Sequence, residues 1–317
     1  MKQLQFEAEN QATWKMLERE LKGRPSRALP GLYRTACLHL ALARDRHYAV
    51  TLQDRLHDLV VRTHEAMYGE RPSRMSVAEF LLRVFPRTVR AQWRVVALSM
   101  LLLFGPFFLL NWLVSHNPDL AASFLSRAKL NQMSAMYSHD AAHWGRQRGA
   151  DSDVQMFGYY IYNNISINFR TFASGIFFGL GSVFFMVFNG ITAGVIAGYL
   201  SATGSGDVFW PFVCGHSAPE ATAAALAGAS GLHLGAALLW PGRLPRLQAL
   251  RVAAQTAFIL LGGAALMTFF AAFIEAFWSS RVDIPAQARF VAGAVLWSGI
   301  WLWLLVGGRR KGKPDAS

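Results

Sequence analysis

Long apolar stretches, separated by short polar or glycine-rich segments, run from residue 95 almost to the end of the chain. The first of them, residues 95–114, contains no charged residue and is long enough to cross about 30 Å of hydrocarbon as a helix. By the same measure we expect spans at about 95–114, 160–182, 183–202, 218–240, 252–278 and 288–306, with an outer segment at 115–159. The pattern therefore predicts an all-α fold, a polytopic membrane helix bundle of about six spans.

The first 94 residues follow a different pattern, in which apolar residues recur at helical spacing among charged ones. Three helices are expected before residue 68, and Pro25 is expected to end the first of them. Ser76 and Glu79 have the spacing of a capping box, which predicts a short helix that Pro86 ends. We therefore divide the chain into a basic cytoplasmic helical domain, residues 1–94, and a transmembrane domain, residues 95–317.

Lysine and arginine gather near the N-terminus, where residues 1–94 carry 17 of the 31 basic residues. Residues 115–160 instead hold four basic and four acidic residues. Because segments rich in Lys and Arg stay on the cytoplasmic side, we expect the N-terminal region, the loop 243–251 and the tail 309–313 to lie inside. The charge pattern thus predicts a multi-pass protein of the bacterial cytoplasmic (inner) membrane, in contact with membrane lipids, with both termini cytoplasmic.

The remaining composition argues against several classes of protein. A net charge of +12 suits nucleic-acid binding, but no zinc-finger spacing or basic repeat is present, so we expect no nucleic-acid partner. Cys37 and Cys214 support no disulfide framework, and the first 94 residues lack the apolar core of a cleavable signal peptide. His57 and His64 lie two helical turns apart without an acidic or cysteine partner at a standard spacing, so we expect no metal site and no cofactor.

Polar residues within or beside the spans are the candidate functional residues, because hydrocarbon excludes polar groups that have no partner. This intramembrane polar cluster comprises Asn163, Asn164, Asn168, Arg170, Asn189, His216, Glu220 and Glu275. A helix that begins near residue 160 would place Arg170 about 15 Å deep, where a guanidinium needs an acidic partner. We therefore predict an ion pair of Arg170 with Glu220, with Asn164, Asn168 and His216 completing their hydrogen bonds.

Two further expectations concern the acidic members of that cluster. Pro219 and Glu220 suit the first turn of the helix that they would open, since proline needs no hydrogen-bond acceptor there and the positive end of the helix dipole favours a carboxylate. Glu275 follows Arg251 by enough residues to be expected near the outer interface. His216 and Glu220, with Glu275, would be the basis of an intramembrane hydrolase, which is the weakest function hypothesis because no zinc signature, nucleophile elbow or catalytic cysteine accompanies them.

Small residues recur at helical spacing in two of the expected spans. Gly190, Gly194 and Gly198 are spaced by four residues, and residues 231–235 form a second small face. Such faces allow helices to approach closely. Together with the general preference for closed symmetry, they lead us to expect a homodimer.

Several short motifs, in a shared order, make the chain similar to a known family. They are Leu29-Pro30-Gly31-Leu32-Tyr33-Arg34, Asn163-Asn164-Ile165, Asn189-Gly190, His216 to Glu220, and Ile274-Glu275-Ala276-Phe277. In these the chain resembles the stage II sporulation protein M (SpoIIM) family of bacterial integral membrane proteins, although Ser217 stands where that family usually has glycine. Family members with a long basic N-terminal region occur beside MoxR-type AAA ATPases and von Willebrand factor A domain proteins. The resemblance implies a component of an envelope complex with such partners, or with envelope proteins.

Three functions are compatible with these residues. The first is a non-enzymatic integral membrane component of a bacterial envelope complex, which anchors or couples cytoplasmic and envelope partners. The second is a transporter or channel whose polar path is lined by Asn164, Asn168, Arg170 and Glu220. The third is the intramembrane hydrolase. We expect the first, a protein that is not an enzyme.

Overall fold

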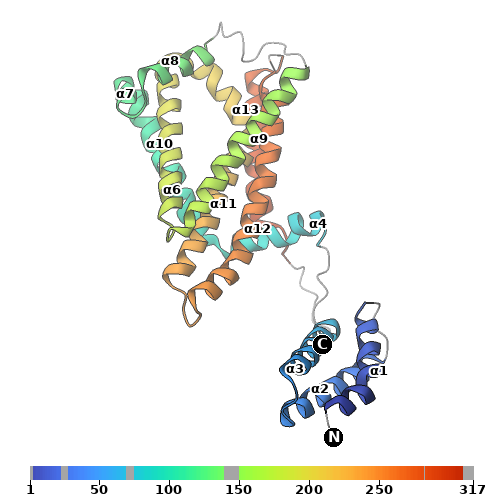
Figure 1. The fold of residues 1–317 in the computed structure, drawn as a ribbon. Coiled ribbons are helices and arrows are strands. Elements are labelled where there is room, and N and C mark those ends of the chain that lie inside the picture. The colour runs from blue at the N-terminus through green and yellow to red at the C-terminus, as the bar shows by residue number, and fades with distance from the viewer. Residues whose placement is uncertain (1–2, 23–27, 69–74, 139–149, 282, 310–317) are drawn as a thin grey trace, which may run out of the picture. The chain divides into compact units, whose positions relative to one another are not determined.

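The computed structural model describes residues 3–22, 28–68, 75–138, 150–281 and 283–309, which are largely helical and contain no strand. The expected all-α fold is therefore confirmed. The chain divides into two compact units, Met1–Met75 and Ser76–Ser317, so residues 76–94 belong to the same unit as the apolar helices (Figure 1). The helix end expected at Pro25, residues 139–149 of the outer segment and the tail 310–317 lie outside the described residues.

The N-terminal unit is a small bundle of the helices α1 (Gln3–Lys22), α2 (Leu29–Asp45) and α3 (Val50–Tyr68). Its core contains the fully buried side chains of Trp14, Leu17 and Leu56. The indole Nε1 of Trp14 donates a hydrogen bond of 3.0 Å to Nδ1 of His39, which is itself buried. The apolar stripe of each helix is thus buried against the other helices of the unit, as the helical spacing predicts.

The helical segment within residues 76–91 does not end at Pro86, as the sequence suggested it would. Ser76 caps the short helix α4 (Val77–Glu79), its hydroxyl accepting from the backbone N–H of Glu79 at 3.0 Å. The chain then passes through a π-helical turn, η1 (Phe80–Val84), into the helix α5 (Phe85–Ala91), in whose first turn Pro86 lies. Proline tolerates that position because the first-turn N–H groups have no partner within a helix.

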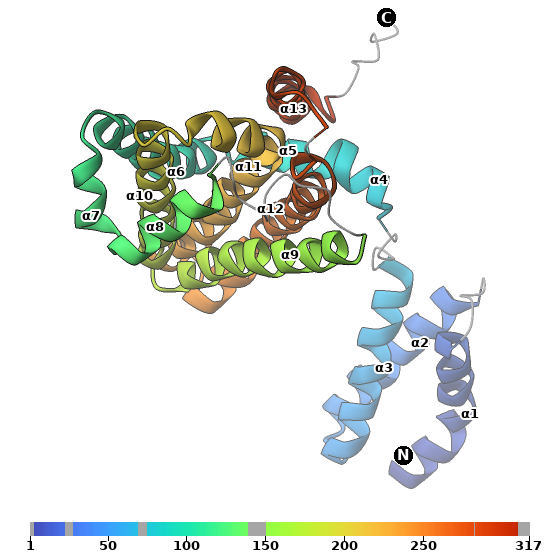
Figure 2. The same ribbon diagram turned by 90° about the horizontal axis from the view of Figure 1, so that it is seen from above.

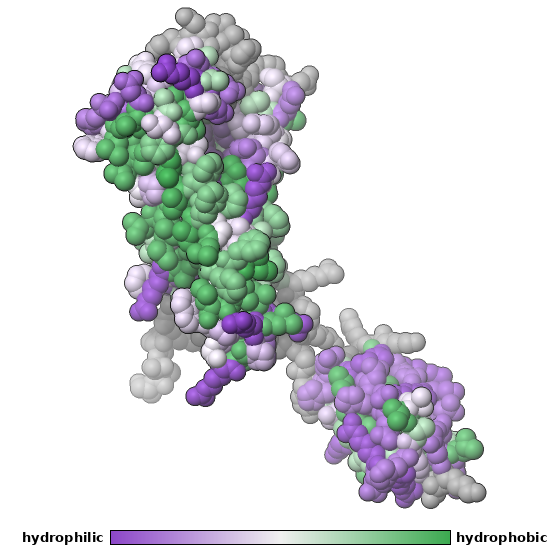
Figure 3. All heavy atoms as spheres, turned by 60° about the vertical axis from the view of Figure 1, so that its left-hand side comes forward, coloured by the Kyte–Doolittle hydropathy of each residue, from purple (hydrophilic) through white to green (hydrophobic). Residues whose placement is uncertain are grey.

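Six long helices make up the rest of the second unit: α6 (Trp93–His116), α9 (Ala150–Ala173), α10 (Leu180–Ala202), α11 (Gly206–Leu239), α12 (Arg246–Ile274) and α13 (Ala286–Val306). They lie side by side, and α11 contacts each of the others (Figures 1 and 2). All except α9 are long and apolar enough to cross a membrane. Figure 3 shows one apolar face of this bundle, with polar side chains gathered at its two ends.

The short elements between α6 and α9 form one end of the bundle. They are η2 (Pro118–Leu120), α7 (Ala121–Phe124) and α8 (Arg127–Met136). Leu130, Met133 and Tyr137 turn their side chains inward against α10 and the start of α11. This amphipathic segment therefore covers the bundle end at which α11 begins (Figure 1).

At the opposite end, the start of α6 and the end of α13 lie together. The guanidinium of Arg90, on α5, donates hydrogen bonds of 2.6 Å to the carbonyls of Leu304 and Gly307. These interactions satisfy carbonyls at the end of α13 that have no partner within the helix. Because both ends are held there, the chain enters and leaves the bundle on the same side.

The helix α9 runs along α12 although its composition is more polar. Tyr160 packs against Ala272 and Ala276, whereas Phe172 packs against Ala253 and Ala257, so the two helices are antiparallel. The chain reverses in η3 (Ser174–Ile176) and two left-handed residues, Phe178 and Gly179, before α10 begins at Leu180. The reversal lies earlier in the chain than the junction at 182–183 that the sequence suggested.

The glycines of α10 pack against α6 within the same chain. A Cβ atom at Gly190, Gly194 or Gly198 would lie 2.3, 2.5 or 2.7 Å from a backbone carbonyl oxygen of α6. Gly231 and Gly235, on α11, are equally crowded by Ser182 and Gly179. Both small faces pack against other segments of the same chain. They therefore give no support to the expected homodimer. A dimer would have to use another surface.

Candidate functional site

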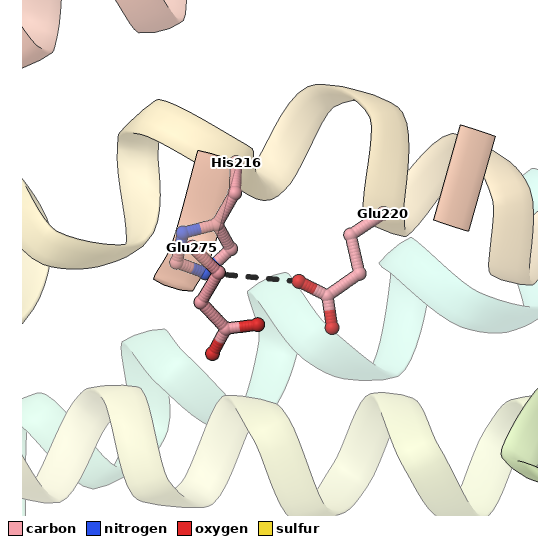
Figure 4. A group of neighbouring side chains, drawn as sticks. All are labelled: His216, Glu220 and Glu275. Carbon is pink, nitrogen blue, oxygen red and sulfur yellow. Dashed lines mark ion pairs between the residues drawn. The ribbon is translucent and has the colours of Figure 1, made fainter. Parts of the chain in front are cut away.

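Three ionisable side chains meet inside the second unit, near the end covered by α8. His216 and Glu220 lie one turn apart on α11, and the imidazole Nε2 is 3.7 Å from a carboxylate oxygen of Glu220. Glu275 reaches the same place from the end of α12 (Figure 4). One ligand-type atom from each residue lies within 4.8 Å of the other two. We call these three residues the His216 cluster.

Two prolines lie within the helix that carries His216 and Glu220. Because α11 begins at Gly206, Pro211 and Pro219 are inside it, and Glu220 is not at a helix start. The helix start expected near residue 218 and the capping role of Glu220 are therefore wrong. Pro219 has no N–H to donate to the carbonyl of Gly215, one turn earlier, so the helix lacks one regular hydrogen bond next to the cluster.

Glu275 owes its position to a second irregular turn. The end of α12 continues into the π-helical turn η4 (Glu275–Ser279), which widens the backbone spiral. Ser279 belongs to this turn, and its hydroxyl lies 3.0 Å from Nδ1 of His216. Ser279 thereby fixes the orientation of the imidazole and leaves its Nε2 facing the carboxyl of Glu220.

The cluster is enclosed mainly by aromatic side chains. His216 is 3% exposed and Glu275 8% exposed, and the ring of Phe212 packs edge-on to the imidazole. Gly215 leaves room for Trp278, whose ring would lie 2.4 Å from a Cβ atom at that position. The ring of Tyr137 packs against that of Phe212. Burial, together with the nearby carboxyls of Glu275 and Glu220, raises the pKa of the Tyr137 phenol.

The carboxyl groups of the cluster have incomplete partners. Oε2 of Glu275 is buried, and no described residue donates a hydrogen bond to it. Within the described ranges, the one ion pair of Glu220 is with His216, and Glu275 has none. Two carboxyls in an apolar bundle without an Arg or Lys partner would be costly if both were ionised. The site can therefore bind a proton or a cation.

The ion pair predicted between Arg170 and Glu220 is not formed. The helix α9 begins at residue 150, so Arg170 lies in its last turn rather than near its middle, and the side chain is exposed. Glu220 contacts His216 instead. The prediction failed because it took the first apolar residues of the segment as the start of the helix.

The asparagines of the predicted cluster have separate roles. The side-chain amide of Asn168 donates to the hydroxyl of Thr268 at 2.7 Å, which joins α9 to α12. The side-chain amide of Asn163 donates to the side-chain Oδ1 of the buried Asn164 at 2.9 Å, and Asn189 is half-buried on α10. Asn168 therefore acts as a polar contact between helices.

Sequence reasoning missed the residues that support the cluster. Ser279 and Tyr137 were not among the candidates, although both lie beside His216 or its acidic partners. A serine next to Trp278 carries no signal of its own, because its position depends on the π-helical turn. The expectation of no metal site was drawn from His57 and His64, and His216 was not considered as a metal ligand together with Glu275, which is far away along the chain.

Comparisons with known proteins extend these observations. Residues 100–280 match the family described as Stage II sporulation protein M, and residues 4–69 match a Domain of unknown function (DUF8413). Comparisons with curated proteins and with solved structures found no match. The first match covers more than half of the chain, including α9 to α12 and the His216 cluster. The chain therefore belongs to the Stage II sporulation protein M (SpoIIM) family.

Proposed function

We propose that this SpoIIM-family membrane protein is a non-enzymatic component of a bacterial envelope complex, which couples a cytoplasmic partner to the membrane. The observation that carries the proposal is the division of the chain into a helical unit, Met1–Met75, and an apolar bundle, Ser76–Ser317. The first unit buries its own apolar core and needs no lipid. It is thus suited to bind a soluble protein, while the second unit anchors it.

The partner class follows from the family resemblance and from the charge of the chain. MoxR-type AAA ATPases and von Willebrand factor A domain proteins are the proposed cytoplasmic partners, and envelope proteins are the proposed partners of α7 and α8. The 17 basic residues among residues 1–94 also favour contact with anionic lipid headgroups. A homodimer is a further proposal, through a surface other than the glycine faces.

Photo-crosslinking in living cells tests the proposal. A photoreactive amino acid at Leu38, which is 58% exposed on α2, should give a discrete adduct with a cytoplasmic protein. The matched control is Phe108, which is 61% exposed on the apolar helix α6 and should give no such adduct. Further positions on α1 and α3, such as Met16 and Val61, extend the scan over the unit. If no position on α1 to α3 gives a protein adduct, the coupling function is wrong.

The alternative function is transport through the bundle. The path suggested from the sequence loses two of its members, because Asn168 is bonded to Thr268 and Arg170 is exposed in the last turn of α9. The His216 cluster, in which His216 and Glu275 are buried and Glu220 is half-buried, is the observation that still favours transport, since carboxyls within a bundle often mark ion pathways. Solute or ion flux into vesicles that contain the purified protein would establish it.

A further inference from the structure

The His216 cluster has the composition of a metal site, a property that goes beyond the coupling function and does not depend on it. Zn²⁺ and related ions bind imidazole nitrogen and carboxylate oxygen, often with three protein ligands. Two of the three residues lie one helical turn apart on α11, and the third comes from η4. This combination of a local pair and a distant third ligand fixes the position of an ion between two elements.

The distances in the cluster suit an ion that all three residues bind. Metal–ligand bonds of about 2.0–2.2 Å place neighbouring ligands of a tetrahedral ion roughly 3.4 Å apart. The imidazole Nε2 and a carboxylate oxygen of Glu220 are 3.7 Å apart, and the atom of Glu275 lies within 4.8 Å of both. Small rotations of the glutamate side chains are sufficient to bring the atoms to bonding distance.

The surroundings of His216 match those of a metal-bound histidine. Such a histidine usually donates its other ring N–H to an oxygen, which fixes its orientation. The hydroxyl of Ser279, 3.0 Å from Nδ1, is in the position to accept that hydrogen bond. Nε2, the atom that faces Glu220, is then the free ligand.

The need for a cation follows from the unpartnered carboxyl. Glu275 is 8% exposed, and its Oε2 has no hydrogen-bond partner within the part of the chain that the structure describes. Among the described residues no Arg or Lys forms an ion pair with Glu220 or Glu275. A divalent ion would balance the charge of two carboxylates and bind the buried oxygen. A proton shared between the carboxyls is the competing arrangement, which the experiment distinguishes.

We propose that His216, Glu220 and Glu275 bind one divalent transition-metal ion, with Ser279 orienting the imidazole. Three protein ligands leave at least one coordination position for water or another ligand. The ion would join the middle of α11 to the end of α12, beneath Tyr137.

Zinc binding to the full-length protein in lipid discs tests the proposal. After removal of metal with a chelator, the wild-type chain should bind one Zn²⁺, measured by elemental mass spectrometry and by competition with a fluorescent zinc chelator. His216→Gln and Glu275→Gln should each weaken binding by about 100-fold or more, and Ser279→Ala by about 10- to 100-fold. His233→Gln and Asp207→Asn, on the same helix α11, are the matched controls and should bind zinc as the wild type does.

Two further measurements guard against misfolded variants and a different ligand set. Zinc should raise the unfolding temperature of the wild type and of both controls but not that of His216→Gln. Each protein is compared in the presence and in the absence of zinc. X-ray absorption at the zinc edge should show nitrogen and oxygen ligands only. Three results would overturn the proposal. The first is a sulfur ligand, which would come from Cys37 or Cys214. The others are zinc binding that survives in both His216→Gln and Glu275→Gln, and no zinc binding by the wild type.

Discussion

The hydrogen bond between Trp14 and His39 makes the N-terminal unit sensitive to pH. Nδ1 of His39 accepts from the indole N–H, so it must carry no proton. Burial lowers the pKa of His39 below its usual value near 6.5. The unfolded chain therefore takes up a proton at a higher pH than the folded one, and the resulting stability is present above about pH 6.5 and lost as the pH falls.

We predict that lowering the pH from 7.5 to 5.5 reduces the protection factors for amide hydrogen exchange in α1 and α2 of the full-length protein, that is, raises the exchange rates relative to those of an unstructured peptide at the same pH. In His39→Gln this pH dependence should be largely lost, because no buried imidazole is left to take up a proton. His57→Gln, at an exposed position on α3, is the control and should keep the wild-type response. An unchanged pH response in His39→Gln would show that His39 is not the group responsible.

The candidate residues could be chosen from the sequence, but their partners could not. His216, Glu220 and Glu275 stand out because ionisable residues are rare in apolar stretches. Glu220 was paired with the wrong residue, since the depth of Arg170 depends on where α9 begins. Ser279 was missed because the π-helical turn that presents it leaves no sequence signal.

Close packing of α10 on α6 depends on glycine at each contact. We predict that Gly194→Ala destabilises the bundle by about 1–3 kcal/mol, the usual cost of overpacking. The added methyl group would lie 2.5 Å from the carbonyl oxygen of Phe107, so the two helices must move apart. Reversible unfolding in mixed detergent micelles measures the change in free energy.

Gly299 provides the matched control for that substitution. It lies within α13, and apart from its chain neighbours and the backbone of its own helix, no atom of the described residues lies within 4 Å of a Cβ atom at this position. Gly299→Ala should cause no loss of stability, because alanine favours the helix and meets no neighbour. Equal losses for Gly194→Ala and Gly299→Ala would mean that contact with α6 does not decide the effect.

Helices with a clear apolar pattern were predictable, whereas the irregular ones were not. Apolar spacing located the N-terminal helices and the span at 95–114, which is the interior of α6. Proline was misleading at Pro86 and Pro219, where it was read as the end or the start of a helix. At both places tertiary packing keeps the chain helical: Phe85 is fully buried against Gly263, and Pro219 is buried within α11.

We propose that the bundle crosses the membrane an even number of times. Five helices are apolar enough to cross, yet Arg90 holds the end of α13 beside the start of α6. An odd number of crossings would separate these two ends. We therefore propose that α9, which runs antiparallel to α12, is the sixth crossing, and that its polar face is tolerated because Asn164 and Asn168 are buried against the bundle.

Cysteine accessibility tests most directly whether the chain links the cytoplasm to the outer side of the membrane. Cys37 and Cys214 are first replaced, and single cysteines are placed at Asp140, between α8 and α9, and at Asp315, after α13. A membrane-impermeant maleimide should label position 140 in cells with a permeable outer layer, and position 315 only after the inner membrane is opened. Labelling of position 315 before the inner membrane is opened would show that the C-terminal tail is not cytoplasmic.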